Sequence, residues 1–148
     1  MTKDNTIDYH LKTAWQSVAN SYNQAASKVG LTQASGYVLI NIHKEGTAVS
    51  QIAGLLGVRS TSLSRMLSAM EKQGLIYREV SELDKRSVKV FLTALGIEKR
   101  KMAKSIVRNF NNYLVAHMSE SERLRLEKSL IKINQLSQRF FQDHIKES

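Results

Sequence analysis

The sequence predicts a mainly helical fold that contains one small two-stranded β-hairpin. Two observations support this fold class. Apolar residues recur at three- and four-residue steps over long stretches at both ends of the chain, which is the spacing of amphipathic helices. One short segment past the middle alternates apolar and polar residues, which is typical of a half-buried strand. The chain also has no proline, so no proline interrupts a long helix.

The composition indicates one globular domain of 148 residues and excludes several classes of protein. Hydrophobic residues make up 42% of the chain, which is enough for a packed core. The absence of cysteine excludes disulfides, thiolate metal ligands and a thiol redox switch. Residues 1–8 are polar and lack the apolar core of a signal peptide, and no stretch approaches the roughly 20 apolar residues of a membrane span. We therefore expect a cytoplasmic protein with no membrane partner.

The charge balance favours a polyanionic partner. Lys and Arg total 22 against 13 Asp and Glu, which gives a net charge of +9. Such a surplus is typical of proteins that bind nucleic acid or an anionic membrane face, although it can also serve solubility alone. Most of the positive charge follows Gly57. Part of it is bunched at Lys99, Arg100, Lys101, Lys104 and Arg108.

The first half of the chain is expected to begin with two helices. Residues 5–29 place their apolar side chains on one face, and Gly30 is suited to end that helix. Residues 33–44 fit a second helix, which Gly46 would end.

The second half is expected to contain the hairpin and two long helices. Residues 75–80 and 87–92 fit two strands joined by a polar, charged connection. Thr93 can cap a helix that runs to about residue 118. Ser119 and Glu122 form a capping-box pattern that would start a last helix ending near residue 144.

Residues 50–56 and 60–73 between these parts resemble a helix-turn-helix pair. Ala53 supplies the small residue that a close helix crossing needs, and Gly57 tolerates the positive φ of the turn. Ser50 and Ser60 are the expected N-caps. The residues expected to lock the two helices together are Ile52, Leu56, Val58, Leu63 and Met66. The alternative is an ordinary helical hairpin that binds nothing.

The second helix of this pair has a face suited to DNA. Leu63, Met66, Leu67 and Met70 cluster on one side at 100° per residue, and the opposite side has no acid and no large apolar residue. Small hydroxyls can approach phosphates and base edges, and an arginine can bind guanine with two hydrogen bonds. The candidate DNA-contacting residues are Ser60, Thr61, Ser62, Ser64, Arg65, Ser68 and Lys72. The alternative is a solvated helix face.

The tip of the hairpin carries Asp84, Lys85 and Arg86. An arginine on a thin hairpin can enter a narrow minor groove, where the negative potential is enhanced. Lys85 and Arg86 are therefore candidate DNA contacts. Asp84 would be repelled by phosphate, so we expect it to brace the tip by pairing with Arg86 or Arg78. The alternative is a surface turn with incidental charges.

These motifs resemble one family of bacterial regulators. Gly74-Leu75-Ile76, Arg78, Asp84-x-Arg86 and Leu92-Thr93-x-x-Gly96 are similar to the wing signature of the MarR family, although Leu83 before Asp84 departs from its common pattern. The resemblance implies a winged helix-turn-helix protein in which residues 60–73 are the recognition helix and Arg86 is the minor-groove arginine. It also implies that the first helix and the last two form a homodimer, and that a small ligand relieves repression.

The resulting prediction is a single MarR-like domain over residues 1–148. Residues 33–93 would form the DNA-binding part, and residues 5–29 and 94–144 the dimerisation helices. The protein would bind double-stranded DNA sequence-specifically at a palindromic operator with half-sites about one helical turn apart. The alternatives are a non-specific architectural DNA-binding protein and a dimeric helical adaptor that binds protein. Repression and activation are not distinguished by the sequence, and neither the operator nor the effector is predicted.

No catalytic or metal site is predicted. His10, His43, His117 and His144 are dispersed without the spacing of metal ligands, so no metal or cofactor is expected. The chain has no nucleophile elbow, phosphate loop or paired acids, so it is not expected to be an enzyme. Trp15, Tyr22 and Tyr37 are candidate lining residues of a pocket for a small aromatic effector, or else ordinary core residues.

Overall fold

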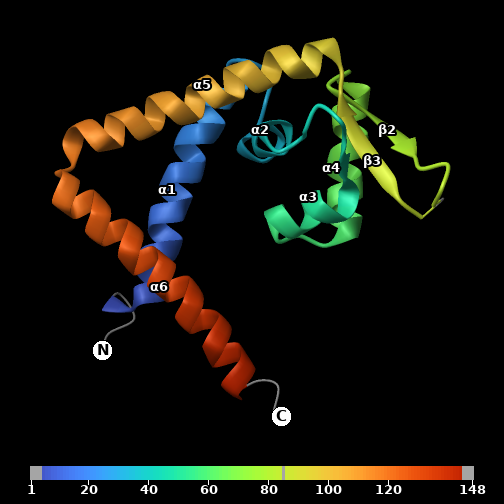
Figure 1. The fold of residues 1–148 in the computed structure, drawn as a ribbon. Coiled ribbons are helices and arrows are strands. Elements are labelled where there is room, and N and C mark those ends of the chain that lie inside the picture. Colours follow the sequence, from blue (N-terminus) through green and yellow to red (C-terminus); the bar gives the residue numbers. More distant parts are fainter. Residues whose placement is uncertain (1–4, 85, 145–148) are drawn as a thin grey trace. The chain divides into compact units, whose positions relative to one another are not determined.

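The structure, a computed structural model, describes residues 5–84 and 86–144 (Figure 1). The chain divides into one compact unit that ends at Val107 and a second that begins at Arg108. The first unit contains α1 (Ile7–Ser27), α2 (Gln33–Ile40), β1 (Thr47–Ala48), α3 (Val49–Leu56), α4 (Ser60–Lys72), β2 (Ile76–Val80), β3 (Val88–Leu92) and the first part of α5 (Ala94–His117). The second contains the rest of α5 and α6 (Glu120–His144). The predicted fold class, mainly helical with a small hairpin, is confirmed.

The helix α1 ends at Ser27, two residues before the predicted end, and Gly30 has the predicted role after it. Gly30 adopts a φ of +77°, and the amide of Leu31 donates to the carbonyl of Ala26 at 2.9 Å. This geometry closes the helix, because a left-handed residue turns the chain back over the last carbonyls.

The end of α2 differs from the prediction, because the helix stops at Ile40 and not at residue 44. The amide of His43 donates to Thr47 Oγ1 at 2.9 Å, and the amide of Gly46 donates to the carbonyl of His43 at 3.0 Å. These bonds form a turn before β1 that competes with further helix. Gly46 therefore belongs to this turn, where its φ is +88°. A Cβ at this position would lie 2.6 Å from the Phe91 ring.

The helix-turn-helix pair consists of α3 and α4, and Gly57 between them has the expected left-handed conformation, with a φ of +63°. The predicted caps are wrong. Ala48 and Arg59 occupy the N-cap positions, without side-chain cap hydrogen bonds, and Ser50 and Ser60 lie inside the helices. Val58 is 38% exposed, so it does not lock the pair as predicted. The other four locking residues pack in or against the core, namely Ile52, Leu56, Leu63 and Met66.

The hairpin belongs to a three-stranded antiparallel sheet with the strand order β1-β3-β2. The sequence did not predict β1, which is only two residues long. Tyr77 pairs with Phe91, and their rings stack with centroids 5.3 Å apart on the face away from the core. Ile76 of β2 and Val90 of β3 are buried on the opposite face, and Lys89 beside Val90 is exposed, as the alternation predicted for residues 87–92 requires at these two positions.

The core of the first unit lies between α2, α3, α4 and the sheet. Its fully buried side chains are Val38, Leu39, Ile42, Ile52, Leu63, Leu67, Met70 and Val90. The face of α4 that was predicted to be apolar is the face that packs into this core.

The start of α5 is fixed to the end of α4 by the Leu92-Thr93-x-x-Gly96 motif. Thr93 Oγ1 donates to the carbonyl of Gly74 at 2.6 Å and accepts from the amide of Gly96 at 3.0 Å. A Cβ on Gly96 would lie 2.0 Å from the carbonyl oxygen of Leu75, so only glycine fits there. The motif is thus explained by close backbone packing.

The second unit begins within α5, and its second helix starts with the predicted capping box. The amide of Ser119 donates to Glu122 Oε2 at 2.8 Å, and the amide of Glu122 donates to Ser119 Oγ at 3.1 Å. No described residue of α6 is buried, although the helix carries many large apolar side chains. The exposed ones are Leu124, Leu126, Leu130, Ile131, Leu136, Phe140 and Phe141. No helix within the described ranges is long and apolar enough to cross a membrane.

Candidate nucleic-acid interface

The N-terminal end of α4 and the β2–β3 hairpin, which we call the wing, border a groove with a volume of about 500 Å³. Ser60, Thr61 and Ser64 line it from α4, and Arg86 lines it from the wing. The sequence predicted all four as DNA contacts, and the fold brings them to one concave surface. Three hydroxyls and a guanidinium at one surface are suited to phosphates and base edges.

The other predicted residues of α4 lie in two different settings. Ser62, Arg65 and Lys72 are exposed on the helix, outside the lining of this groove, and are free of the core. Ser68 is half-buried, and its hydroxyl accepts a hydrogen bond from Arg78 Nη2 at 3.2 Å. Its hydroxyl therefore holds the wing strand and is less available to DNA than predicted.

Arg78 joins the wing to α4 through an ion pair that the sequence did not predict. Its Nε and Nη2 atoms donate to the two carboxylate oxygens of Glu71 at 2.8 and 3.0 Å. The hydrogen bond from Arg78 lowers the pKa of the Glu71 carboxyl, and the same bond raises the pKa of Arg78. The two side chains are 32% and 28% exposed, so solvent screens the pair in part.

The tip of the wing is braced by backbone contacts. Asp84 Oδ1 accepts from the main-chain amide of Arg86 at 3.0 Å, and the carbonyl of Asp84 accepts from the amide of Ser87 at 2.9 Å. The expected pairing of Asp84 with Arg78 is wrong, because Arg78 is bound to Glu71. The predicted contact residue Lys85 lies outside the described residues. The side chain of Arg86 is exposed beside the groove.

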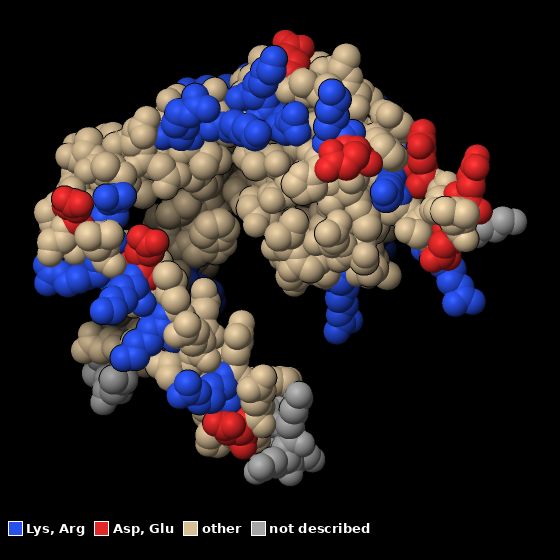
Figure 2. Space-filling view, viewed as in Figure 1, with Lys and Arg blue, Asp and Glu red and all other residues tan. Residues whose placement is uncertain are grey.

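The sequence did not distinguish two groups of basic residues that have different surroundings in the structure. Arg59 is exposed at the N-cap of α4, next to the groove residues, and is an additional candidate for a phosphate contact. In contrast, Lys99 Nζ donates to the carbonyl of Val29 at 2.7 Å, and Arg100 Nη1 donates to the carbonyl of Ile42 at 3.0 Å. Figure 2 shows Lys and Arg gathered over α5, but these two side chains hold the fold together.

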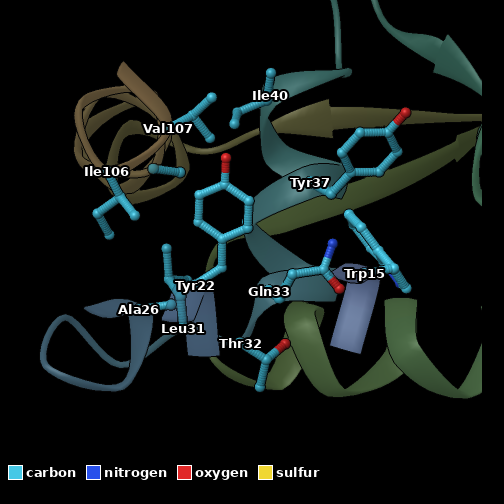
Figure 3. A pocket seen from close by; sticks show the side chains of 12 residues that line it. Trp15, Tyr22, Ala26, Leu31, Thr32, Gln33, Tyr37, Ile40, Ile106 and Val107 are labelled. Atoms are coloured by element: carbon cyan, nitrogen blue, oxygen red, sulfur yellow. The ribbon is translucent and has the colours of Figure 1, made fainter. Parts of the chain in front are cut away.

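A separate cavity of about 220 Å³ lies between α1, α2 and the first part of α5. Trp15, Tyr22 and Tyr37, the three residues named from the sequence, all line it (Figure 3). Trp15 is 55% and Tyr37 is 38% exposed, so these two rings are not ordinary core residues. That they bind an effector stays a prediction.

The described residues include no cluster of three or more His, Asp or Glu side chains that could hold a metal ion. What the fold presents is a helix-turn-helix with an exposed polar second helix, flanked by a hairpin that carries an arginine at its tip. These features define a winged helix-turn-helix DNA-binding protein.

Comparison with known proteins identifies the family. The model of the MarR family matches residues 31–88, which contain the helix-turn-helix and most of the wing. The organic hydroperoxide resistance transcriptional regulator of Bacillus subtilis is 31% identical over 97 residues, which cover 65% of this chain and 66% of that protein. The chain belongs to the MarR family and is a DNA-binding transcription regulator of the winged helix-turn-helix type.

Solved structures share the fold over most of the chain. The crystal structure of the S. aureus MepR–DNA complex has a TM-score of 0.81 at 25% identity and covers 88% of this chain and 97% of its own. A mutant MarR from E. coli complexed with operator DNA has a TM-score of 0.79 at 24% identity, with 90% and 99% covered. The chain is therefore a transcription regulator of this family and not an enzyme.

Proposed function

We propose that this regulator binds double-stranded DNA sequence-specifically, as a homodimer on a palindromic operator, and that a small ligand releases it. The observation that carries the proposal is the groove where Ser60, Thr61 and Ser64 of α4 face Arg86 of the wing. In this arrangement α4 would enter the major groove while Arg86 reaches the adjacent minor groove. MepR and MarR, which share the fold, were both solved in complex with DNA.

The distribution of charge supports DNA as the partner. Arg59, Arg65 and Lys72 are all exposed along α4, and the single acid of that helix, Glu71, is neutralised by Arg78. Phosphate contacts from such residues would supply most of the affinity and make it salt-dependent. Because a regulator of transcription acts on chromosomal DNA, we place it in the cytoplasm.

The apolar surface supports a homodimer. Large apolar side chains remain exposed on α1, at Ile7 and Tyr9, and along the whole of α6. A single chain in water does not leave so many such residues uncovered without a partner surface. A second copy that covers these helices would also set two recognition helices one helical turn of DNA apart.

The cavity that contains Trp15, Tyr22 and Tyr37 supports a ligand response. It is lined by α2, which leads into the helix-turn-helix, and by α5, which continues from the wing. A ligand that fits only one arrangement of these helices would shift the population of DNA-binding conformers. The resemblance to the family favours a repressor that the ligand releases.

Selection of binding sites from random double-stranded DNA tests the proposal. A palindrome with half-sites about one helical turn apart is expected, bound at least ~10³-fold more tightly than unrelated DNA. Equal binding of all sequences would indicate an architectural DNA-binding protein, and salt-independent or absent DNA binding would indicate a protein adaptor. Sedimentation of the same preparation at micromolar concentration should show a dimer, and a monomer would contradict the half-site geometry.

A further inference from the structure

We propose that Leu83, in the loop at the tip of the wing, is a DNA contact that selects base pairs without an amino group in the minor groove. This contact differs in character from Arg86, because it is apolar and independent of the phosphates. It rests on the proposed function in one respect, namely that the wing reaches the minor groove. The exposure of Leu83, the hydrogen bonds of its loop and the local balance of charge all support it.

Leu83 takes no part in the packing of the fold. It is 100% exposed, and no other large apolar residue in the described ranges exceeds 64%. Figure 1 shows the loop between β2 and β3 at the end of the wing away from α5. A fully exposed leucine at the end of a hairpin is in the position that a bound surface meets first. Its apolar surface is therefore available in full for a contact with DNA.

Hydrogen bonds on both sides of Leu83 brace the loop that carries it. The amide of Ser81 donates to the carbonyl of Ser87 at 2.9 Å, and the amide of Asp84 donates to Ser81 Oγ at 3.4 Å. Asp84 in turn accepts from the amides of Arg86 and Ser87, at 3.0 and 2.9 Å. The same braced loop thus presents Leu83 and Arg86. Less conformational freedom is then lost when the loop binds.

The wing does not share the positive charge of the chain. The whole chain has a net charge of +9, whereas residues 79–89 contain three acidic and three basic side chains. Attraction to phosphates is therefore weak over this segment as a whole. Burial of an apolar side chain supplies affinity that does not depend on salt, which this neutral segment otherwise lacks.

The minor groove is suited to a leucine beside an arginine. It is about 6 Å wide, so single side chains enter it, and leucine is one of the apolar residues that proteins insert there. A·T pairs present only acceptors in this groove, and the donors of Arg86 can satisfy them. A G·C pair adds the guanine amino group, a donor for which neither Leu83 nor Arg86 has an acceptor. Covering that donor costs free energy, so the two residues together select pairs that lack it.

The acids on either side of Leu83 do not reverse this preference. Asp84 Oδ1 already accepts from the amide of Arg86, and the phosphates along the groove would repel both carboxylates. Glu82 is exposed, so its side chain is free to turn toward solvent. The loop therefore offers the guanine amino group no favourable acceptor.

The test changes the minor groove and leaves the major groove unaltered. The probe is the double-stranded DNA that the full chain selects from a random pool, or the pool itself if no sequence is preferred. Replacing adenine by 2,6-diaminopurine adds the amino group, and replacing guanine by inosine removes it, with the same major-groove pattern in each case. Fluorescence anisotropy at several salt concentrations gives the affinities. We expect diaminopurine to weaken binding of the wild type about fivefold or more, and inosine not to weaken it.

Two substitutions of Leu83 separate its apolar character from its size. Leu83→Asn supplies an acceptor, so it should bind unmodified DNA about three- to tenfold more weakly and lose most of the penalty for diaminopurine. Leu83→Met stays apolar and should behave as the wild type does. Neither variant removes a charge, so the salt slope should not change. Leu95→Asn, at an exposed apolar position of α5, is the matched control and should bind as the wild type does. Circular dichroism verifies that all variants are folded.

Arg86→Ala, measured in parallel, distinguishes failure of this contact from failure of the proposed function. An effect of Arg86→Ala, together with wild-type affinity or an undiminished diaminopurine penalty in Leu83→Asn, overturns the leucine contact and leaves the proposed function standing. A penalty that depends on Leu83, together with no effect of Arg86→Ala, supports the leucine contact and overturns the assignment of Arg86. If neither substitution nor diaminopurine has an effect, the wing does not reach the minor groove and both are overturned.

Discussion

Arg78 of β2 binds both carboxylate oxygens of Glu71 of α4, at 2.8 Å from Nε and 3.0 Å from Nη2. The same guanidinium donates to Ser68 at 3.2 Å. One side chain of the wing therefore contacts two successive turns of the recognition helix. This contact joins the two elements that border the groove, and it neutralises the negative charge of the helix that we propose to face DNA.

Replacing Arg78 tests whether this contact positions the wing. Arg78→Met is expected to lower the free energy of unfolding by about 0.5–1 kcal/mol, since the pair is bidentate but partly exposed. It should also weaken specific DNA binding more than binding to random DNA, because the wing loses its fixed angle. Denaturant unfolding and fluorescence anisotropy measure the two effects. Lys101→Met, at an exposed position on α5, is the matched control and should change neither; an equal effect in both variants would contradict the positioning role.

The same pair predicts a pH dependence of stability. Arg78 lowers the pKa of the Glu71 carboxyl in the folded state below its ordinary value of 4.5. The stabilisation is therefore fully present above pH 4.5 and is lost as the pH falls through the folded-state pKa. Wild type should be more stable than Glu71→Gln near neutral pH, and the difference should vanish in acid. A difference that grows as the pH falls would show that the sign is wrong.

Two substitutions of Asp84 at the wing tip separate the loss of its acceptor oxygen from the loss of its charge. Asp84→Ala removes the oxygen that accepts from the amide of Arg86, so it should loosen the tip and weaken DNA binding. Asp84→Asn keeps an acceptor oxygen and should bind DNA close to wild type. Arg86→Ala should weaken DNA binding directly, with the thermal midpoint nearly unchanged because the residue is exposed. Wild-type affinity in Arg86→Ala would contradict the minor-groove assignment.

We expect substitution by alanine to have opposite effects on stability at two glycines that lie within helices. A Cβ on Gly96 would lie 2.0 Å from the carbonyl oxygen of Leu75, so Gly96→Ala should cost about 2–4 kcal/mol or prevent folding. A Cβ on Gly54 in α3 would meet no atom within 4 Å, so Gly54→Ala should stabilise the protein by up to about 1 kcal/mol. Thermal unfolding of both variants measures the two changes in stability. Similar changes in the two variants would contradict the close packing at Gly96.

Most of the fold could be predicted from the sequence because its signals are local. The left-handed turn at Gly57 and the capping box of Ser119 and Glu122 depend on residues a few positions apart, and both were found as expected. The predicted N-caps at Ser50 and Ser60 are wrong, because any serine near the start of a helix fits the N-cap pattern. The strand β1 was missed because a two-residue strand has no period to detect.

The residues of the candidate site were chosen from the sequence by type, whereas the contacts between their side chains could not be predicted. Ser60, Thr61, Ser64 and Arg86 were chosen by residue type and helix face, and they line one groove. The partner of Arg78 could not be predicted, because Glu71 meets it only after the chain reverses near Gly74. The roles of Lys99 and Arg100 likewise depend on carbonyls far away in the sequence. Side-chain contacts across elements require the fold itself.

We propose that α4 reads DNA sequence, and substitution of Arg65 tests this proposal. Arg65 is exposed in the middle of α4, whereas Lys72 is exposed at its last position. Lys72→Ala is the comparison variant, because a phosphate contact should weaken operator and scrambled DNA equally and reduce the salt slope by about one.

The measurement is the affinity of Arg65→Ala for the selected operator and for scrambled DNA at several salt concentrations. We predict a loss of about 1–3 kcal/mol on the operator, little loss on scrambled DNA, and relaxed choice at one base position of each half-site. An equal loss on both DNAs would contradict base reading by Arg65 and leave it to Thr61, Ser62 and Ser64.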